Sequence, residues 1–574
     1  MMPAKASVVI VGAGPCGLML ANELGRRGVS TIVVDREGGV ATAPQANATQ
    51  ARSMEHYRRL GFADAIRKLG LPGDYPTDVA YFTTYAGYEL ARHSMPSSGD
   101  AARFVRENEQ VWNGPELPHR VPQSLVEQTL FRKAEALDDV SLRFNCELSG
   151  FVEDETGIIA DVKNLTDGTR KLIRASYLFG ADGAQSQVRK QLGIRYAGAD
   201  ASQRDFMGGR MLSIYIDAPA FYTELRNPKA WMYWTFNKRR RALLAAVDGR
   251  GKFVLQTQLK DHEHAETMTE EDAGQLFLQS VGADIPFKVT GIASWLAGRA
   301  LVAERFGEGR VLLGGDAVHL FTPTGGMGYN TAIEDAVNIG WKLAAVVKGH
   351  ADPALLSTYE AERRPVALRN TRFAIGFADS IGLYVPSPAI EDEGPAGEAA
   401  RSRAGAYLEQ HARKEFTIPG FTLGARYDAS PAVFRDGTPI PPDAPSVYVP
   451  SAKPGGRAPH AWLKDGSSLF DRFGFEWTLL VFNPASPAAQ LFAEEAARRG
   501  LDLEIVDLSG EPVAADLYEA QFAIIRPDQV VGWRGSISDS SDATAVFDTL
   551  TGRSMAEKNN FNPALAVEDA RKRA

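Results

Sequence analysis

Cysteine is scarce in this sequence, with only Cys16 and Cys146 among 574 residues. Two cysteines cannot build a disulfide framework, and no Cys or His spacing typical of a zinc site is present. Disulfide-stapled secreted domains and zinc modules are therefore excluded, and we expect no bound metal. The low cysteine content fits a reducing compartment, so we expect a cytoplasmic protein.

Long apolar runs and an excess of positive charge are also missing. The uncharged stretch 6–22 has the length of a signal peptide, but its glycines and Pro15 would break an export-type apolar helix. No other run approaches the roughly 20 apolar residues that cross a bilayer. The 63 Lys and Arg residues face 71 Asp and Glu residues, a formal net charge of −8. We expect a soluble protein whose partners include neither a membrane nor a nucleic acid.

The sequence does contain a glycine-rich turn between a strand and a helix. The β-branched run 7–11 predicts a buried parallel strand, 15–28 a helix, and 31–34 a second strand closed by Asp35. The intervening turn has G-x-G-x-x-G spacing, which allows a tight turn and a close backbone approach to a diphosphate at the helix N-terminus. Asp35 can accept hydrogen bonds from a ribose, so this unit predicts dinucleotide binding.

The rest of the chain divides into segments that differ in composition and in the pattern of apolar residues. Two further strands run into glycines, at 177–183 and 310–316, and the second leads into a long helix at 326–347. Residues 205–260 alternate apolar and polar positions, which is typical of antiparallel strands with one face against a core or a ligand. The stretch 386–404 is rich in Pro, Gly, Ala and charge and predicts a linker or a loosely attached helix.

After about residue 425 the pattern of apolar and polar residues changes again. Strand candidates at 477–482 and 523–526 lie on either side of a helical stretch at 488–499. This order predicts a small α/β domain at the C-terminus.

Three motifs together carry a family resemblance. Asp182-Gly183, and Gly315-Asp316 ahead of Pro323-Thr324-Gly325-Gly326-Met327-Gly328, resemble the DG and GD motifs of the FAD-dependent aromatic hydroxylases, the single-component flavoprotein monooxygenases. The resemblance continues through 359–365 and into 454–460 and 526–534, which look like the thioredoxin-like C-terminal domain of the phenol hydroxylase branch. Because this tail has no Cys-x-x-Cys pair, dithiol chemistry is excluded there, and we expect a packing or dimerisation element.

The resemblance implies an α/β fold with a Rossmann-like FAD-binding domain, an inserted antiparallel-sheet substrate domain and a C-terminal thioredoxin-like α/β domain. The expected bounds are 1–80, 105–190 and 288–375 for the FAD-binding domain, 81–104 and 191–287 for the substrate-binding sheet domain, 376–424 for a helical segment and linker, and 425–574 for the thioredoxin-like domain.

It also implies bound FAD, with NADPH or NADH as a transient reductant and O₂ as co-substrate. No second glycine fingerprint exists for the nicotinamide cofactor, as the family leads us to expect. Asp316 could accept hydrogen bonds from the ribityl chain, and the helix N-terminus after the GD loop would stabilise the anion of reduced flavin. The candidate FAD-binding residues are Gly12, Gly14, Pro15, Cys16, Gly17, Asp35, Arg36, Gln45, Arg52, Gln123, Asp182, Gly183, Asp316, Pro323, Gly325, Gly326, Met327, Gly328 and Asn330.

The family's reaction is hydroxylation of a phenolic or electron-rich aromatic substrate through a flavin hydroperoxide. A free phenol has a pKa near 10, so a nearby proton acceptor helps. Relatives often place His or Asp at the position of Asn47, and asparagine can orient a hydroxyl but cannot take its proton. Either another group is the base, or Asn47 positions a substrate that is already acidic. Gln45 stands where many members have Arg.

The candidate catalytic residues are Asn47, Arg210, Tyr233 and Pro323. Pro323 would leave a rigid apolar surface near the reactive flavin carbon. Arg210 could bind a substrate carboxylate or phenolate, or form a structural salt bridge. Tyr215 and the aromatic run 231–234 could line the pocket or belong to the core.

Two other functions stay open. One is Baeyer–Villiger-type or epoxidising oxygenation of a bulky polyketide-like substrate, and the other is a non-catalytic flavin-binding protein. For partners we expect a small aromatic substrate and, as the commonest oligomer, a homodimer.

Overall fold

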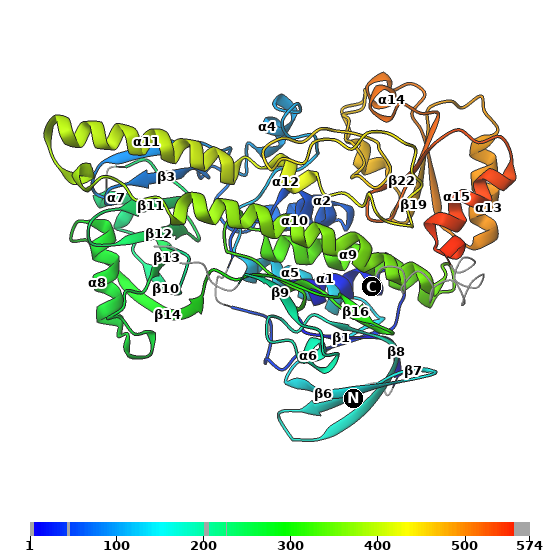
Figure 1. Ribbon diagram of the computed structural model, residues 1–574, viewed down its shortest axis with the longest axis horizontal. Coiled ribbons are helices and arrows are strands. Elements are labelled where there is room, and N and C mark those ends of the chain that lie inside the picture. Colours follow the sequence, from blue (N-terminus) through cyan, green and yellow to red (C-terminus); the bar gives the residue numbers. More distant parts are fainter. Residues whose placement is uncertain (1–4, 43–45, 200–205, 226, 556–574) are drawn as a thin grey trace, which may run out of the picture.

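The computed structural model describes residues 5–42, 46–199, 206–225 and 227–555. Its first layer is an eight-stranded sheet with the order β16-β17-β8-β1-β2-β5, to which β7 and β6 add a hairpin (Figure 1). The strands from β17 to β5 run parallel. The members are β1 (Lys5–Val11), β2 (Thr31–Val34), β5 (Val140–Arg143), β6 (Cys146–Asp154), β7 (Gly157–Asn164), β8 (Arg170–Gly180), β16 (Gly307–Glu308) and β17 (Val311–Leu313).

Helices bury this sheet. α1 (Pro15–Gly25) packs against both α5 (Gln123–Glu135) and α9 (Gly328–Val347). The apolar β1 and β2 are almost completely buried, as strands of a parallel sheet are. The predicted strand–turn–helix–strand unit is confirmed, with the helix ending at Gly25 rather than at residue 28. The short helices are α2 (Ala51–Arg59), α3 (Ala63–Arg67), α4 (Ala101–Glu107), α6 (Gln187–Gln191), α7 (Phe221–Glu224) and α12 (Pro419–Leu423).

A second sheet of seven strands, in the order β14-β10-β13-β12-β11-β3-β4, forms the next layer. Its neighbours pair antiparallel except for β11 and β3, which run parallel. The alternating pattern of 205–260 therefore predicted its centre correctly. The strands are β3 (Val79–Phe82), β4 (Glu89–His93), β10 (Arg210–Asp217), β11 (Met232–Phe236), β12 (Arg241–Ala246), β13 (Lys252–Gln258) and β14 (Lys288–Leu296).

The edges of this second sheet differ from the expected domain bounds. β14 pairs with β10 along its length, so 288–296 belong to the second sheet rather than to the first. As an edge strand, β14 is largely open to solvent and its apolar alternation is weak, which hid it from the sequence. A small sheet of β9 (Tyr196–Ala199), β15 (Ala300–Ala303) and β18 (His319–Leu320) lies in the segments that link the two layers.

Two long helices lie across the layers (Figure 1). α10 (Ser357–Gly382) is followed by α11 (Gly394–Phe416), which packs on β3 and β4, while α8 (Glu270–Val281) covers β14. For 386–404 we expected a linker or a loosely attached helix, and most of this stretch is the start of the ordered helix α11. α11 buries Ala400, Ala404, Leu408 and Ala412, one every fourth residue, and such a stripe rich in alanine has little apolar contrast in sequence.

The C-terminal domain is a four-stranded sheet in the order β20-β19-β21-β22. β19 runs parallel to β20 and antiparallel to β21, the arrangement expected of a thioredoxin-like domain. Its elements are β19 (Trp477–Val481), α13 (Ala488–Arg499), β20 (Leu503–Asp507), α14 (Pro512–Tyr518), β21 (Phe522–Ile525), β22 (Val531–Gly535) and α15 (Ser540–Leu550). Across the described ranges, no helix is both long and apolar enough to span a bilayer.

Buried ion pairs join the C-terminal domain to the first layer. Glu362 of α10 accepts hydrogen bonds from both terminal nitrogens of Arg526 at 2.8 Å and from Lys342 of α9 at 2.6 Å. Arg526 also pairs with Asp528, whose backbone oxygen accepts from Arg52 of α2 at 2.7 Å. The C-terminal domain is therefore fixed to the helices around the glycine loops by charges that water does not reach.

Candidate active site

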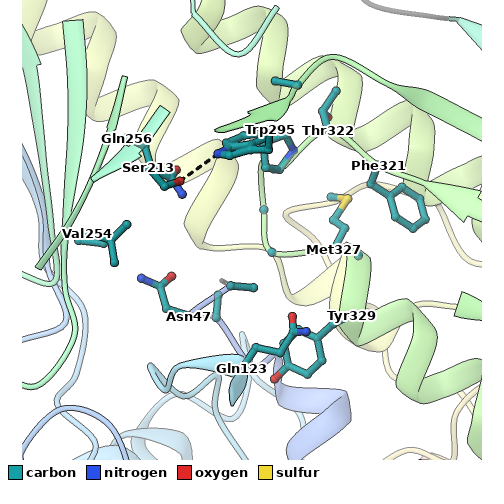
Figure 2. A pocket seen from close by; sticks show the side chains of 18 of the residues that line it. Asn47, Gln123, Ser213, Val254, Gln256, Trp295, Phe321, Thr322, Met327 and Tyr329 are labelled. Carbon is teal, nitrogen blue, oxygen red and sulfur yellow. Dashed lines mark hydrogen bonds between the residues drawn. The ribbon is translucent and has the colours of Figure 1, made fainter. Parts of the chain in front are cut away.

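A cavity of about 750 Å³ lies between the carboxyl edge of the first sheet and one face of the second (Figure 2). On one side it is lined by the loop after β1, by Ala181, Gly183 and Ala184 after β8, and by residues of the loop that leads into the start of α9. Ligands of open α/β sheets bind at this edge, and the volume suits an organic cofactor or substrate.

The first glycine loop needs its glycines for two different reasons. Gly12 has φ +105°, and a Cβ there would lie 2.2 Å from the backbone oxygen of Ala181. At Gly17 a Cβ would lie 1.9 Å from the oxygen of Gly12, so both sites exclude any side chain. Gly14 is different, because a Cβ there would meet no atom within 4 Å and Gly14 lines the cavity. Its backbone is therefore open to a ligand at the start of α1.

The residues present fit a dinucleotide cofactor. Gly14, Gly183 and Gly328 all line the cavity, and a Cβ on any of them would meet open space. Asp182 uses Oδ2 to accept from the backbone of α6, while its Oδ1 is buried without a hydrogen-bond partner in the described structure. Asp316 lines the same cavity. An acceptor without a donor beside a glycine-lined cradle is what a hydroxyl-bearing cofactor would satisfy.

The second glycine loop is held in shape by side chains from three segments. Gly325 and Gly326 have φ +68° and +62°. The side-chain nitrogen of Gln50 donates to the oxygen of Gly325 at 2.6 Å, and that of Asn330 donates to the oxygen of Gly326 at 2.6 Å. The N–H of Gly325 donates to Glu415 at 3.0 Å, so this amide faces a carboxylate rather than the open cradle.

Comparison with known proteins agrees with this geometry. Residues 5–374 match the family model described as FAD binding domain, and 451–554 match that described as aromatic-ring hydroxylase, C-terminal. The chain belongs to the FAD-dependent aromatic-ring hydroxylases. It is 29% identical to phenol 2-monooxygenase of Pseudomonas sp. (strain EST1001), covering 98% of this chain and 94% of that protein.

Solved structures give the same result. The rebeccamycin biosynthetic enzyme RebC with reduced flavin is 33% identical, with a TM-score of 0.84 over 96% of this chain and 100% of that one. The flavin-dependent monooxygenase PieE in complex with FAD and substrate is 28% identical, with a TM-score of 0.82 over 95% and 98% of the two chains. The protein is an FAD-dependent monooxygenase, as its motifs predicted.

The second sheet supplies the opposite wall of the hydroxylase cavity. Because side chains alternate along a strand, one face of five neighbouring strands points inward. Figure 2 shows several of them, with Trp295 donating from its ring nitrogen to the hydroxyl of Ser213 at 3.0 Å. The inward residues are Ser213, Tyr215, Met232, Trp234, Leu243, Ala245, Val254, Gln256, Ala293 and Trp295.

The same alternation removes two of the candidate catalytic residues from this wall. Tyr233 points away from the cavity into an aromatic cluster, and its hydroxyl accepts from the N–H of Ala230 at 2.7 Å. Arg210 is exposed, does not line the cavity and pairs with Glu266 at 2.7 Å. We therefore no longer assign either residue to the site, and Arg210 forms the salt bridge that was its alternative.

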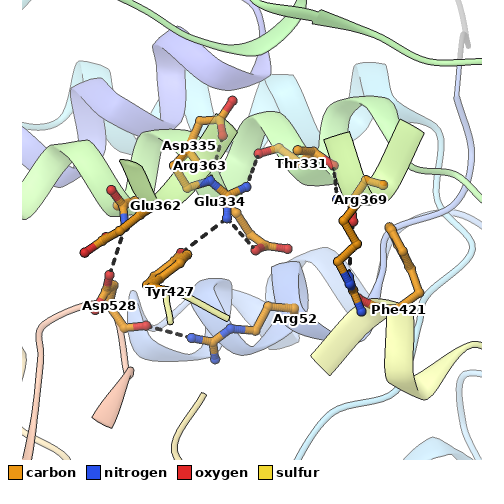
Figure 3. Close-up of polar contacts among 12 residues, drawn as sticks. Arg52, Thr331, Glu334, Asp335, Glu362, Arg363, Arg369, Phe421, Tyr427 and Asp528 are labelled. Atoms are coloured by element: carbon orange, nitrogen blue, oxygen red, sulfur yellow. Dashed lines mark hydrogen bonds and ion pairs between the residues drawn. The ribbon is translucent and has the colours of Figure 1, made fainter. Parts of the chain in front are cut away.

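Several candidate FAD residues lie outside the cavity lining. Arg52 turns toward the C-terminal domain, where it donates to Asp528 and Gln529 (Figure 3), so we no longer assign it to FAD. The side-chain oxygen of Asn330 accepts from the N–H of Gln50, and its side-chain nitrogen donates to the backbone oxygens of Ala48 and Gly326. Asn330 is therefore a positioning residue. Arg36 is exposed beside Glu37.

Asp35 directly follows β2 beside the first glycine loop and is not among the residues that line the cavity. Its Oδ2 accepts from the N–H of Ala13 at 2.5 Å and its Oδ1 from that of Glu37 at 2.8 Å. Gln45 lies outside the described residues.

Most of the remaining candidates line the cavity, whereas Gly12, Gly17 and Asp182 are not among its lining residues. Asn47, Gln123 and Pro323 line it with Cys16, and Figure 2 shows Asn47 and Gln123 among the lining side chains. Gln123 donates to Glu127 at 2.7 Å. Burial, followed by the charge of Asp335, raises the pKa of the Cys16 thiol well above its usual value. This thiol is therefore a neutral packing group rather than a redox nucleophile.

The GD loop is anchored by a buried charge chain. His319 approaches Asp335 at 2.7 Å, and Asp335 also accepts from Arg363 at 2.8 Å. Burial alone would raise the pKa of Asp335, but the opposing attraction of His319 and Arg363 lowers it. His319 thus shapes the loop through a carboxylate that stays ionised.

Sequence reasoning missed several of the cavity residues. Trp295 lies on the unrecognised edge strand β14, and Glu415 and Arg120 carry no motif. The alternating apolar pattern of β10 could have prompted a search for a further strand that pairs with it at the sheet edge, which is where β14 lies. For Arg120 the available signal was a charge directly ahead of the apolar pair Val121-Pro122 and Gln123.

Proposed function

We propose that this monooxygenase hydroxylates a phenolic or other electron-rich aromatic ring held in the 750 Å³ cavity. The observation that carries the proposal is one cavity with two unlike walls, a glycine cradle opposite an aromatic and apolar sheet face. FAD, when bound, supplies the redox chemistry that links NAD(P)H oxidation to activation of O₂.

On the cofactor wall, we assign diphosphate binding to the N-terminus of α1 beside Gly14, where no side chain caps the helix and the first backbone N–H groups have no intrahelical acceptor. Pro15 has no N–H and would contribute only its ring. Asp182 and Asp316 would accept hydrogen bonds from cofactor hydroxyls. The N-terminus of α9 at Gly328 would stabilise negative charge on the isoalloxazine ring, since a helix start carries partial positive charge.

On the substrate wall, the sheet face excludes water and holds the ring, with Pro323 as a rigid apolar contact. Ser213 and Gln256 offer neutral hydrogen bonds on that face. Asn47 would orient a substrate hydroxyl without removing its proton, because its amide is not a base near neutral pH. Preorganised neutral donors of this kind favour the ionised phenol as charge develops on its oxygen.

The domain bounds of the sequence analysis are proposed with β14 moved to the substrate-binding sheet. We also propose that the enzyme is a cytoplasmic homodimer. The low cysteine content fits a reducing compartment, and two-fold dimers are the commonest oligomers. The relatives, which include a phenol 2-monooxygenase, do not favour Baeyer–Villiger or epoxidising chemistry or a non-catalytic flavin-binding role.

A pair of glycine substitutions tests the cofactor wall. Gly14→Val would fill the cradle without a clash inside the protein, since Gly14 has φ −75° and open space at Cβ. Gly376→Val adds the same side chain on α10, also into open space but away from the cavity. We expect FAD affinity to fall at least about tenfold in the first variant and to stay unchanged in the second. Equal affinity in both variants would refute the assignment.

A further inference from the structure

Arg120 is a buried charge that the proposed reaction does not use. It follows the bridge between Thr49 and His119, precedes α5, lines the cavity and is 6% exposed. Its guanidinium carbon lies 3.9 Å from the ring centroid of Trp231, and a terminal nitrogen approaches the sulfur of Met95 at 3.6 Å. Neither neighbour carries a charge.

No carboxylate pairs with Arg120 in the described parts of the chain. Other buried arginines do have such partners: Arg363 pairs with Asp335, and Arg457 with Glu55. Burial lowers the pKa of Arg120 to about 9, so the side chain still holds its proton at neutral pH. An ion removed from water without a counter-ion is costly, and native proteins rarely tolerate it without a compensating partner.

The surroundings indicate where that partner comes from. Trp231 also lines the cavity, and its ring meets the edge of Phe416, another lining residue, at 6.0 Å. Arg120 therefore lies beside the aromatic residues at the end of the second sheet. A guanidinium has a planar fork of donors that matches a carboxylate in two parallel hydrogen bonds.

We propose that the substrate is an aromatic carboxylic acid and that Arg120 binds its carboxylate. This inference rests on the proposed function in one respect, because it takes this cavity as the substrate site. The arginine would then act as a specificity residue, and neutral phenols of the same shape would bind more weakly.

The test compares acids with their neutral amides on the FAD-reconstituted enzyme. The probes are 4-hydroxybenzoate with 4-hydroxybenzamide, and 1-hydroxy-2-naphthoate with 1-hydroxy-2-naphthamide, and dissociation constants come from equilibrium dialysis without NAD(P)H. The variants are Arg120→Met, which keeps bulk without charge, and Arg120→Lys, which keeps charge without the fork. The control is Arg106→Met, because Arg106 is exposed and stacks on Trp462 at 3.7 Å, outside the cavity.

We expect at least one acid to bind about tenfold more tightly than its amide, a charge-assisted contact of ordinary strength. Arg120→Met should remove that preference while leaving amide affinity within about twofold, Arg120→Lys should keep part of it, and Arg106→Met should keep all of it. Equal binding of acid and amide in both wild-type pairs would overturn the proposal, whatever the variants do. Preference retained in Arg120→Met would overturn it as well.

Failure of the proposed function has a separate signature. An acid that binds through Arg120 but gives no hydroxylated product with NAD(P)H and O₂ would contradict the reaction and leave the binding assignment intact. Hydroxylation of neutral phenols with no preference for acids would contradict the binding assignment of Arg120 and leave the proposed reaction intact.

Discussion

The substitution Glu362→Gln should destabilise the junction between the C-terminal domain and the helices of the first layer. In the native protein, Lys342 and Arg526 bring two positive charges, and Glu362 and Asp528 bring two negative ones, all buried. Glutamine keeps the shape but leaves one positive charge uncompensated. Breaking a buried pair by removing one partner costs about 3–5 kcal/mol, and that is the loss we expect in the free energy of unfolding.

A second variant makes the reasoning refutable. In Glu362→Gln with Lys342→Met, the remaining charges of Arg526 and Asp528 balance again, so the double variant should be more stable than Glu362→Gln alone. The assay is urea unfolding of the FAD-loaded protein. One slope of the unfolding free energy against urea concentration is fitted to all variants. A loss below about 1 kcal/mol in the single variant, or no recovery in the double variant, would refute the charge-balance argument.

The same site predicts a pH dependence. Burial alone would raise the pKa of Glu362, but Arg526 and Lys342 outweigh burial and hold it well below its usual range. A carboxylate with a depressed pKa stabilises the fold above its unfolded pKa of about 4.3, and that contribution is lost as the pH falls. The stability difference between wild type and Glu362→Gln should therefore narrow below about pH 4, and a difference independent of pH would contradict this.

Three further substitutions or modifications follow from the cavity. Gly12→Ala should abolish FAD retention, because its Cβ would lie 2.2 Å from the oxygen of Ala181, and a normal flavin content would contradict this. Native protein at pH 8 should resist alkylation of Cys16 by iodoacetamide, because burial raises its thiol pKa, while urea-unfolded protein should react, as mass spectrometry would show. Trp295→Phe removes the hydrogen bond to Ser213 and should raise the KM for an aromatic substrate by up to about tenfold with flavin content unchanged, and an unchanged KM would argue against this wall.

The glycine loops on the cofactor side of the cavity could be located from sequence because their signals are local. The 12–17 turn, Asp182-Gly183 and the 323–328 loop each combine a strand end, a glycine and a helix start within a few residues. The strand limits of β2 and the start of β19 agree with the structure for the same reason.

The substrate half could not be predicted as well, because its side chains meet only through tertiary structure. Residues 232 and 233 are neighbours in sequence, yet strand alternation turns Met232 into the cavity and Tyr233 away from it. Whether Arg52 contacts a cofactor or the C-terminal domain depends on a segment more than 400 residues away, as its 2.7 Å contact with Asp528 shows. Arg120 has no carboxylate partner among the described residues, and sequence alone cannot reveal this.

The central claim is that a flavin on the glycine wall oxygenates an aromatic ring on the sheet wall. The most direct test is to reconstitute the purified protein with FAD and follow NADPH and NADH oxidation against a panel of phenols and phenolic acids, scoring peroxide and product mass. The account predicts oxidation stimulated by one member of the panel, little peroxide and a product heavier by one oxygen atom. A protein that binds no flavin, or that oxidises NAD(P)H without ever forming an oxygenated aromatic product, would contradict it.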